Sequence, residues 1–137
     1  MLSLNGRALL WGIGLFMLLY TLHVLLLPIL VGERVSGSEY QGLLYGINQL
    51  LGISTCFVPG FVCGKISGRM GFVHGAIVGG VGTILTALLA MLWSLATGAR
   101  FFGLAMIPFW LLINIFLSAF AGFIANSSSV SGESEIP

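Results

Sequence analysis

The fold of this chain is decided by residues 52–87, GISTCFVPGFVCGKISGRMGFVHGAIVGGVGTILTA, in which small residues recur every four positions on both sides of a short basic turn. The row before the turn is Gly52, Cys56, Gly60, Gly64 and Gly68, and the row after it is Gly71, Gly75, Gly79, Thr83 and Ala87. Positions four apart lie on one face of a helix. The stretch therefore predicts a glycine-rich antiparallel hairpin of two helices, packed through Gly68 opposite Gly71, Gly64 opposite Gly75, and Gly60 opposite Gly79.

A strict four-residue row does not stay on one face for long. With 3.6 residues per turn it drifts by about 40° at each step, so only two or three steps can face one partner. We expect residues 60–68 and 71–79 to form the hairpin contact. The remaining small residues, including Gly42, Gly46 and residues 79–82, are then expected to meet another helix or another subunit.

Composition places the hairpin in a membrane. The chain has 137 residues, of which 58% are hydrophobic and 7% are charged, whereas soluble domains carry about 25% charged residues. Its mean hydropathy is +1.09. The charged residues leave four uncharged stretches, 8–32, 40–64, 70–99 and 101–132, each longer than the roughly 20 residues that cross a bilayer.

The expected fold class is therefore an all-α membrane protein with four transmembrane helices. We place the spans near 8–31, 42–64, 73–97 and 104–125, with the glycine-rich hairpin formed by the second and third helices. Together they make one transmembrane domain over residues 1–125. Residues 126–137 are rich in serine and end in glutamates, and this composition predicts a disordered polar tail.

The basic residues predict the orientation, because lysine and arginine are retained on the cytoplasmic side of short loops. With the N-terminus inside, Arg7, Lys65 and Arg69 lie in the cytoplasm, and Arg34 and Arg100 lie outside. Both termini are then cytoplasmic. The bias is only three against two, which leaves a dual-topology dimer open as an alternative.

Polar residues inside the membrane are the first candidates for a functional site. Here they are Asn48, Gln49, Asn114 and His23. Asn48 and Asn114 fall in the same half of the bilayer, where they can meet. We favour hydrogen bonds between helices as their role, at about 0.6 kcal/mol each. The alternative is a small polar lining for a pore or a binding pocket.

Several known chemistries do not fit these residues. His23 and His74 lie at different depths and cannot share a haem iron. Cys56 and Cys63 are about 10 Å apart along one helix, too far for a disulfide, and make no zinc site with distant histidines. No span holds a carboxylate for the proton-coupled antiport of the small multidrug transporters. We expect no enzymatic activity, no catalytic residue, no metal and no cofactor.

Residues 60–89, GFVCGKISGRMGFVHGAIVGGVGTILTALL, carry a family resemblance. A helix end of the form G-x-x-x-G-x-x-x-G/R is followed by a helix start of the form G-(W/F)-x-H-G-x-x-x-G. This pattern resembles the central hairpin of the YrzE-like family of small four-span bacterial membrane proteins. The matching positions are Gly60, Gly64, Gly68, Arg69, Gly71, Phe72, His74, Gly75 and Gly79. The resemblance implies a bacterial plasma membrane and the same hairpin, and it brings no biochemical activity with it.

The basic turn is a second candidate site. Lys65, Arg69 and His74 are expected at the inner membrane surface, where basic residues attract anionic lipid headgroups. The alternative, which we favour, is that these residues only hold the turn inside.

Two functional classes fit the sequence. The first, which leads, is a structural, assembly or accessory membrane protein that packs through its glycine faces. The second is a small oligomeric channel or transporter. The expected partners are the lipid bilayer and a second copy or a larger membrane-protein complex, with no nucleic acid.

Overall fold

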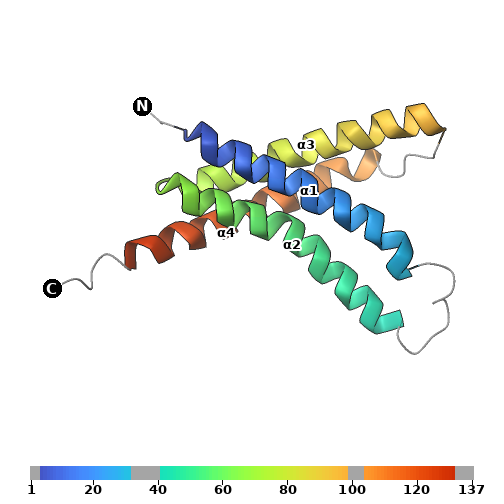
Figure 1. Ribbon diagram of the computed structural model, residues 1–137, viewed down its shortest axis with the longest axis horizontal. Coiled ribbons are helices and arrows are strands. Elements are labelled where there is room, and N and C mark those ends of the chain that lie inside the picture. Colours follow the sequence, from blue (N-terminus) through green and yellow to red (C-terminus); the bar gives the residue numbers. More distant parts are fainter. Residues whose placement is uncertain (1–3, 32–40, 99–103, 132–137) are drawn as a thin grey trace.

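The computed structural model describes residues 4–31, 41–98 and 104–131. Within these ranges the chain forms four long helices, α1 (Gly6–Val31), α2 (Gln41–Ser67), α3 (Gly71–Thr97) and α4 (Ile107–Ser131), with a short 3-10 helix, η2 (Leu104–Met106), before α4 (Figure 1). The helices have 25 to 27 residues, or about 37–40 Å at 1.5 Å per residue. All four are long and apolar enough to cross a membrane. The predicted four-span helical fold is confirmed.

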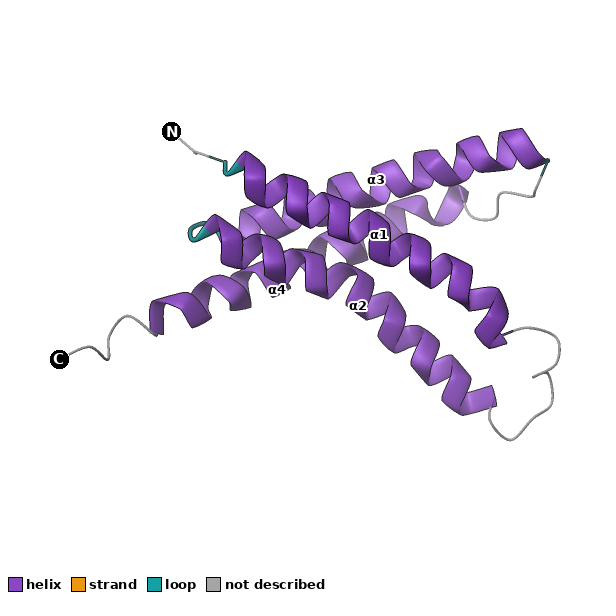
Figure 2. Cartoon of the chain, viewed as in Figure 1, coloured by secondary structure: helices purple, strands orange, loops and turns teal. Residues whose placement is uncertain are grey.

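Helix ends differ from the predicted spans by a few residues, except at the end of α4. Figure 2 shows helix through most of the described chain, with loop only at short connections. The tail predicted to be disordered from residue 126 is helical to Ser131. Ser127 Oγ donates to the Phe123 carbonyl and Ser128 Oγ to the Ile124 carbonyl, at 3.0 and 2.9 Å. These bonds satisfy the serine hydroxyls within the helix, and residues 132–137 lie outside the described part of the chain.

The turn between α2 and α3 uses left-handed backbone at two positions. Gly68 has φ +63°, and Met70 has φ 56° and ψ 36°. A glycine adopts this conformation without steric cost and commonly ends a helix in this way. Gly68 therefore forms the turn and contacts no neighbouring helix, since a Cβ added there would meet nothing within 4 Å. Its predicted packing role is wrong.

The helices form two pairs that cross. In Figure 1, α1 runs beside α2, and α3 runs beside α4. The pairs come together at the end where α2 turns into α3, which we call the turn end, and spread apart at the other end, which we call the open end. Helix α1 begins and α4 finishes at the turn end.

The glycine rows of α2 and α3 face α4 rather than each other. A Cβ added at Gly60 or Gly75 would overlap the backbone of Ser118, and one at Gly64 or Gly71 would overlap the backbone of Gly122. Helices α2 and α3 touch each other less extensively than either touches α4. The two rows thus line a groove that receives the α4 backbone, because missing side chains permit backbone contact.

The predicted pairing across the hairpin is therefore wrong in partner and in register. Gly64 lies level with Gly71, and Gly60 with Gly75, because each pair meets the same residue of α4. This register is one helical turn away from the predicted one. The physical reason is the turn itself, since Gly68 leaves the helix and the rows begin at Gly64 and Gly71.

Helix α1 is held by two further close contacts. A Cβ at Gly12 would lie 2.6 Å from Val78 Cγ2 and 2.9 Å from Cys63 Cβ, and a Cβ at Gly82 would lie 2.6 Å from Phe16 Cδ1. Residues Ala8, Phe16, Cys56, Cys63 and Val78 form a buried apolar cluster beside these contacts. The turn end is closed by this packing.

Candidate functional site

A cavity of about 950 Å³ lies between the two helix pairs toward the open end, and all four helices line it. Its volume is at the upper end of the range for small-molecule sites, about 300–1,000 Å³. The lining combines the aromatic residues Tyr20, Tyr45, Phe109 and Trp110 with the polar residues His23, Asn48, Gln49, Thr55, Thr83, Thr86 and Asn114. A mainly apolar wall with a few polar groups is typical of a ligand-binding pocket.

The floor of the cavity is a hydrogen-bond network around Asn114, which we call the Asn114 network. Asn114 Nδ2 donates to Thr83 Oγ1 at 2.9 Å, and Cys56 Sγ donates to Asn114 Oδ1 at 3.1 Å. Thr83 Oγ1 in turn donates to the Gly79 carbonyl at 2.6 Å. The network joins α2, α3 and α4. Asn114 therefore has both predicted roles, because it bonds between helices and also lines the cavity.

One wall of the cavity carries His23 of α1 and Asn48 of α2. The imidazole lies beside Gly52, where an added Cβ would be 3.8 Å from His23 Cε1 and 3.9 Å from His23 Nε2. A Cβ at Gly52 would meet no neighbouring backbone and would make only ordinary van der Waals contact with this ring, so the predicted close-packing role of Gly52 is wrong. Asn48 lies one turn before Gly52 on the same helix face.

The polar atoms of this wall have fewer hydrogen-bond partners than those of the floor. His23 Nδ1 and Asn48 Oδ1 are buried and have no hydrogen-bond partner. Asn48 and Asn114 line the same cavity, but the Asn114 amide is bonded to Thr83 and Cys56 instead. Residues 48 and 56 are two helical turns apart, about 12 Å along the axis, so the two asparagines do not meet. Gln49 also lines the cavity and is exposed.

The described lining residues carry no Asp, Glu, Lys or Arg. Lys65 and Arg69 flank the turn between α2 and α3 at the turn end, and Arg7 lies in the first turn of α1. The remaining charged residues, Glu33, Arg34, Glu39, Arg100, Glu133 and Glu135, lie outside the described ranges. Within the described chain, the cavity is uncharged and polar at its floor and at one wall.

His74 is buried inside the bundle, which corrects its predicted contact with lipid headgroups. The side chain is 1% exposed. Its Nε2 accepts the backbone N–H of Asn5 at 3.0 Å. Nδ1 therefore carries the proton and donates to the Met70 carbonyl at 3.1 Å. Through these bonds the buried His74 links α3 to the start of α1.

Lys65 and Arg69 are exposed at the turn end. Their contact with lipid headgroups stays a prediction.

Asn5, whose backbone N–H donates to His74, also accepts the Ala8 backbone N–H at 3.2 Å through Oδ1 and so acts as the N-cap of α1.

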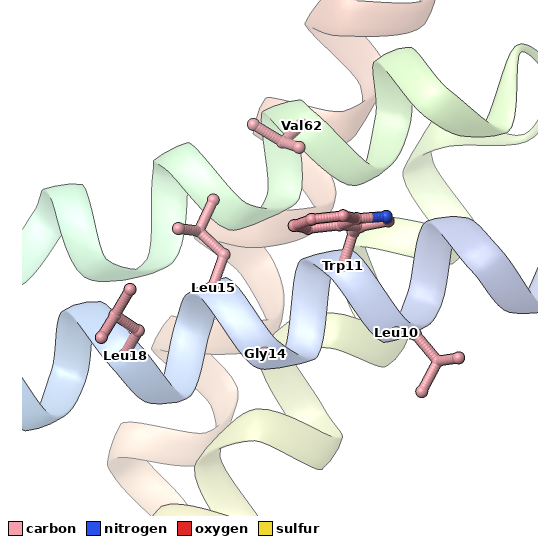
Figure 3. Close-up of a pocket in the computed structure, with 6 residues that line it drawn as sticks. All are labelled: Leu10, Trp11, Gly14, Leu15, Leu18 and Val62. Atoms are coloured by element: carbon pink, nitrogen blue, oxygen red, sulfur yellow. The ribbon is translucent and has the colours of Figure 1, made fainter.

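A second depression, of about 610 Å³, lies on the outer face of α1 and α2 (Figure 3). It is lined by Leu10, Trp11, Gly14, Leu15, Leu18 and Val62. Figure 3 shows the Trp11 ring and Leu15 directed toward α2, with Leu10 directed away. Apart from the indole N–H, these side chains offer no hydrogen-bonding group, so this face resembles ordinary lipid-facing surface.

Sequence reasoning missed part of the cavity. Thr55 and Thr86 line it and were not singled out, although Thr83, which belongs to the small-residue row, meets Asn114. A signal was present in the sequence, because threonines at 83 and 86 extend the glycine row of α3 toward the open end with hydroxyl groups.

No family model, curated protein or solved structure matches this chain. The fold and the site define the class of protein, an integral membrane protein with four membrane-spanning helices. The YrzE-like resemblance remains an expectation from the hairpin residues.

Proposed function

We propose that this protein binds a small molecule in the cavity at its open end and belongs with small channels or carriers. The observation that carries the proposal is the cavity of about 950 Å³, which has polar groups at its floor and wall. Below the floor, backbone contacts between α4 and the glycines of α2 and α3 close the bundle. A site that is open at one end and sealed at the other is the expected form of one access state of a carrier.

The glycine rows give less support to the accessory role than the sequence suggested. Gly60, Gly64, Gly71, Gly75 and Gly79 face α4, and Gly82 faces Phe16. These glycines are used within one chain and need no second subunit to explain them.

The positive residues Lys65 and Arg69 favour placing the turn end in the cytoplasm, so that the cavity opens to the outside of a bacterial plasma membrane.

Helix α2 offers a point at which the bundle could change shape. Pro59 has no N–H, so the Thr55 carbonyl loses its usual partner, and Thr55 lines the cavity floor. The neighbouring Gly60 packs directly on Ser118. Bending of α2 at Pro59 would change the floor first, because the residues on its two sides belong to the cavity and to the closed end.

Tryptophan fluorescence tests the binding proposal. All three tryptophans are exposed, but only Trp110 lines the cavity, and Trp11 and Trp93 lie outside it. In protein reconstituted in lipid nanodiscs, W11F/W93F keeps Trp110 as the reporter. We expect 4-bromobenzyl alcohol, whose bromine quenches nearby tryptophan, to quench Trp110 along a saturable binding curve.

The matched control is W11F/W110F, which keeps only Trp93. Its quenching should rise linearly with the probe, because it reports partition into lipid alone. Identical linear curves for Trp110 and Trp93 would overturn the proposed function.

A second candidate function is the accessory role, and the exposed glycines near the start of α2 favour it. A Cβ at Gly42 or Gly46 would meet nothing within 4 Å. Small residues gain nothing from lipid but permit close contact with another helix. Single-molecule photobleaching in a bilayer tests for a homo-oligomer, and copurification from the native membrane tests for a larger complex. A monomer that copurifies with no other protein would exclude this role.

A further inference from the structure

We infer that His23 and Asn48 form the polar subsite of the cavity, and that the subsite takes an uncharged, mainly apolar molecule with one hydroxyl or amide group. The inference rests on the proposed function, because it names the class of ligand for the same cavity. It adds the two residues that recognise the polar group of that ligand.

The first observation is the uneven distribution of unsatisfied polar atoms. At the floor, Asn114 has both sides of its amide bonded, to Thr83 and to Cys56. On the wall, His23 Nδ1 and Asn48 Oδ1 are buried without a partner. Buried polar atoms lose free energy unless they are hydrogen-bonded. The unpartnered polar atoms of the cavity lining thus belong to the wall rather than to the floor, and because both atoms are closed to water, a ligand reaches them when the His23 ring and the Asn48 amide turn toward the cavity that they line.

The second observation is that the two side chains come from neighbouring helices and lie about one helical turn apart in level. His23 comes from α1, and the two contacts nearest to a Cβ at Gly52 are its ring atoms Cε1 and Nε2. Asn48 lies one turn nearer the open end on the Gly52 face of α2. The imidazole therefore lies beside α2 at the level of Gly52, on the helix face that also carries Asn48.

The chemistry of the two groups selects the ligand. A neutral imidazole has one donor and one acceptor nitrogen, and an asparagine amide has an acceptor oxygen and a donor nitrogen. A hydroxyl or amide group both donates and accepts, so it satisfies either orientation of both side chains. A carboxylate offers no donor to Asn48 Oδ1, and an ammonium group offers no acceptor.

The rest of the lining excludes a strongly charged ligand. The described lining residues carry no carboxylate, lysine or arginine, and an ion without a counter-charge is costly to bury. Tyr20, Tyr45, Phe109 and Trp110 supply aromatic surface for an apolar body. A hydroxyl or amide on an aromatic or aliphatic body therefore fits both parts of the cavity.

The test uses three probes of the same shape on the Trp110 reporter in nanodiscs. They are 4-bromobenzyl alcohol, 4-bromotoluene and 4-bromobenzoate. We expect the alcohol to bind about three- to tenfold more tightly than the toluene, the effect of one or two hydrogen bonds. The benzoate should bind most weakly. This comparison needs no substitution in the cavity wall.

Substitutions then test whether His23 and Asn48 cause the preference for the alcohol over the toluene. H23F or N48L should bring the affinity for the alcohol down to that for the toluene and leave the affinity for the toluene unchanged. S54A is the matched control, since Ser54 is an exposed polar residue of α2 outside the cavity lining, bonded to the Leu50 carbonyl of its own helix, and it should keep the preference. Retention of the alcohol preference in both H23F and N48L would overturn the subsite.

The outcomes separate the two proposals. Saturable quenching with equal affinity for the alcohol and the toluene would refute the subsite and leave the proposed function standing. Tightest binding of the benzoate would refute the uncharged ligand class. Linear quenching of Trp110 by all three probes would refute the proposed function itself.

Discussion

At the residue scale, glycines without a side chain determine how closely the helices pack at the turn end. Gly60 and Gly75 approach Ser118 from two different helices, and a Cβ at either position would overlap the Ser118 backbone. The contact is with main chain, which cannot rotate away as a side chain does. Substitution at these glycines must therefore separate helices.

Gly75→Ala is expected to destabilise the protein strongly. Its methyl group would overlap Ser118 and Ala119 backbone atoms, and overpacking of this kind costs about 1–3 kcal/mol or more. Gly46→Ala is the matched control, because a Cβ there meets nothing within 4 Å. Unfolding in mixed micelles measures both. Equal stability of the two variants would contradict the close contact with α4.

The Asn114–Thr83 hydrogen bond is also open to measurement, through a double-mutant cycle. Asn114→Ala and Thr83→Ala each remove one partner of a 2.9 Å bond at the cavity floor. Hydrogen bonds between membrane helices average about 0.6 kcal/mol and reach about 1.7 kcal/mol. We expect a favourable coupling energy in this range for the free energy of unfolding. Strictly additive effects would show that the bond does not join α3 and α4.

At the element scale, the sequence predicted the helices and their contact faces but not their partners. The four-residue spacing identified Gly60, Gly64, Gly71, Gly75 and Gly79 as close-packing positions, and each of them meets backbone. Spacing within two helices contains no information about a third. Ser118 and Gly122 of α4, which fill the groove, are also small residues four positions apart, a spacing that predicts close packing but does not name the partner helix.

The site was predictable to a similar degree. Asn48, Gln49, His23 and Asn114 were selected because polar groups are rare in spans, and all four line one cavity. The cavity itself depends on how far the helix pairs diverge, which is a tertiary property. The role of His74 was misjudged because its position near the turn says nothing about Asn5, which lies 69 residues away in sequence and bonds to it.

His74→Phe is expected to release the start of α1. The variant keeps a ring of similar size but removes the acceptor of the Asn5 N–H, a loss of about 1 kcal/mol or more for a buried bond. Hydrogen exchange at the amide of Asn5 should become faster. Phe72→Leu, an exposed position in the same turn of α3, should leave that exchange unchanged. Unaltered protection of the Asn5 amide in His74→Phe would show that the hydrogen bond to His74 does not hold the start of α1.

At the scale of the whole molecule, the two ends of the bundle differ in structure. The turn end is closed by glycine contacts and an apolar cluster, and the open end holds the polar cavity. An even number of spans places the start of α1 and the end of α4 on the same side. The orientation proposed from the basic residues makes that side the cytoplasm.

Cysteine labelling tests the orientation. In a Cys56→Ser, Cys63→Ala background, Ile66→Cys reports the turn end and Thr97→Cys the open end, since both positions are exposed. We expect an impermeant thiol reagent to label Ile66→Cys only from the cytoplasm and Thr97→Cys only from outside. The reverse pattern would show the opposite orientation, and labelling of each position from both sides would indicate dual topology.

The central claim is that the open end holds a water-accessible cavity between the helix pairs, and two neighbouring residues of α3 test it most directly. Ala90 lines the cavity, whereas Leu89 is exposed outside its lining, on a surface that faces lipid in a bilayer. The measurement is the rate of modification of Ala90→Cys and Leu89→Cys by a charged, impermeant thiol reagent, in the same cysteine-free background and in a bilayer. The account predicts rapid modification of Ala90→Cys from the side of the open end and slow modification of Leu89→Cys. Equal rates, or an unreactive Ala90→Cys, would contradict it.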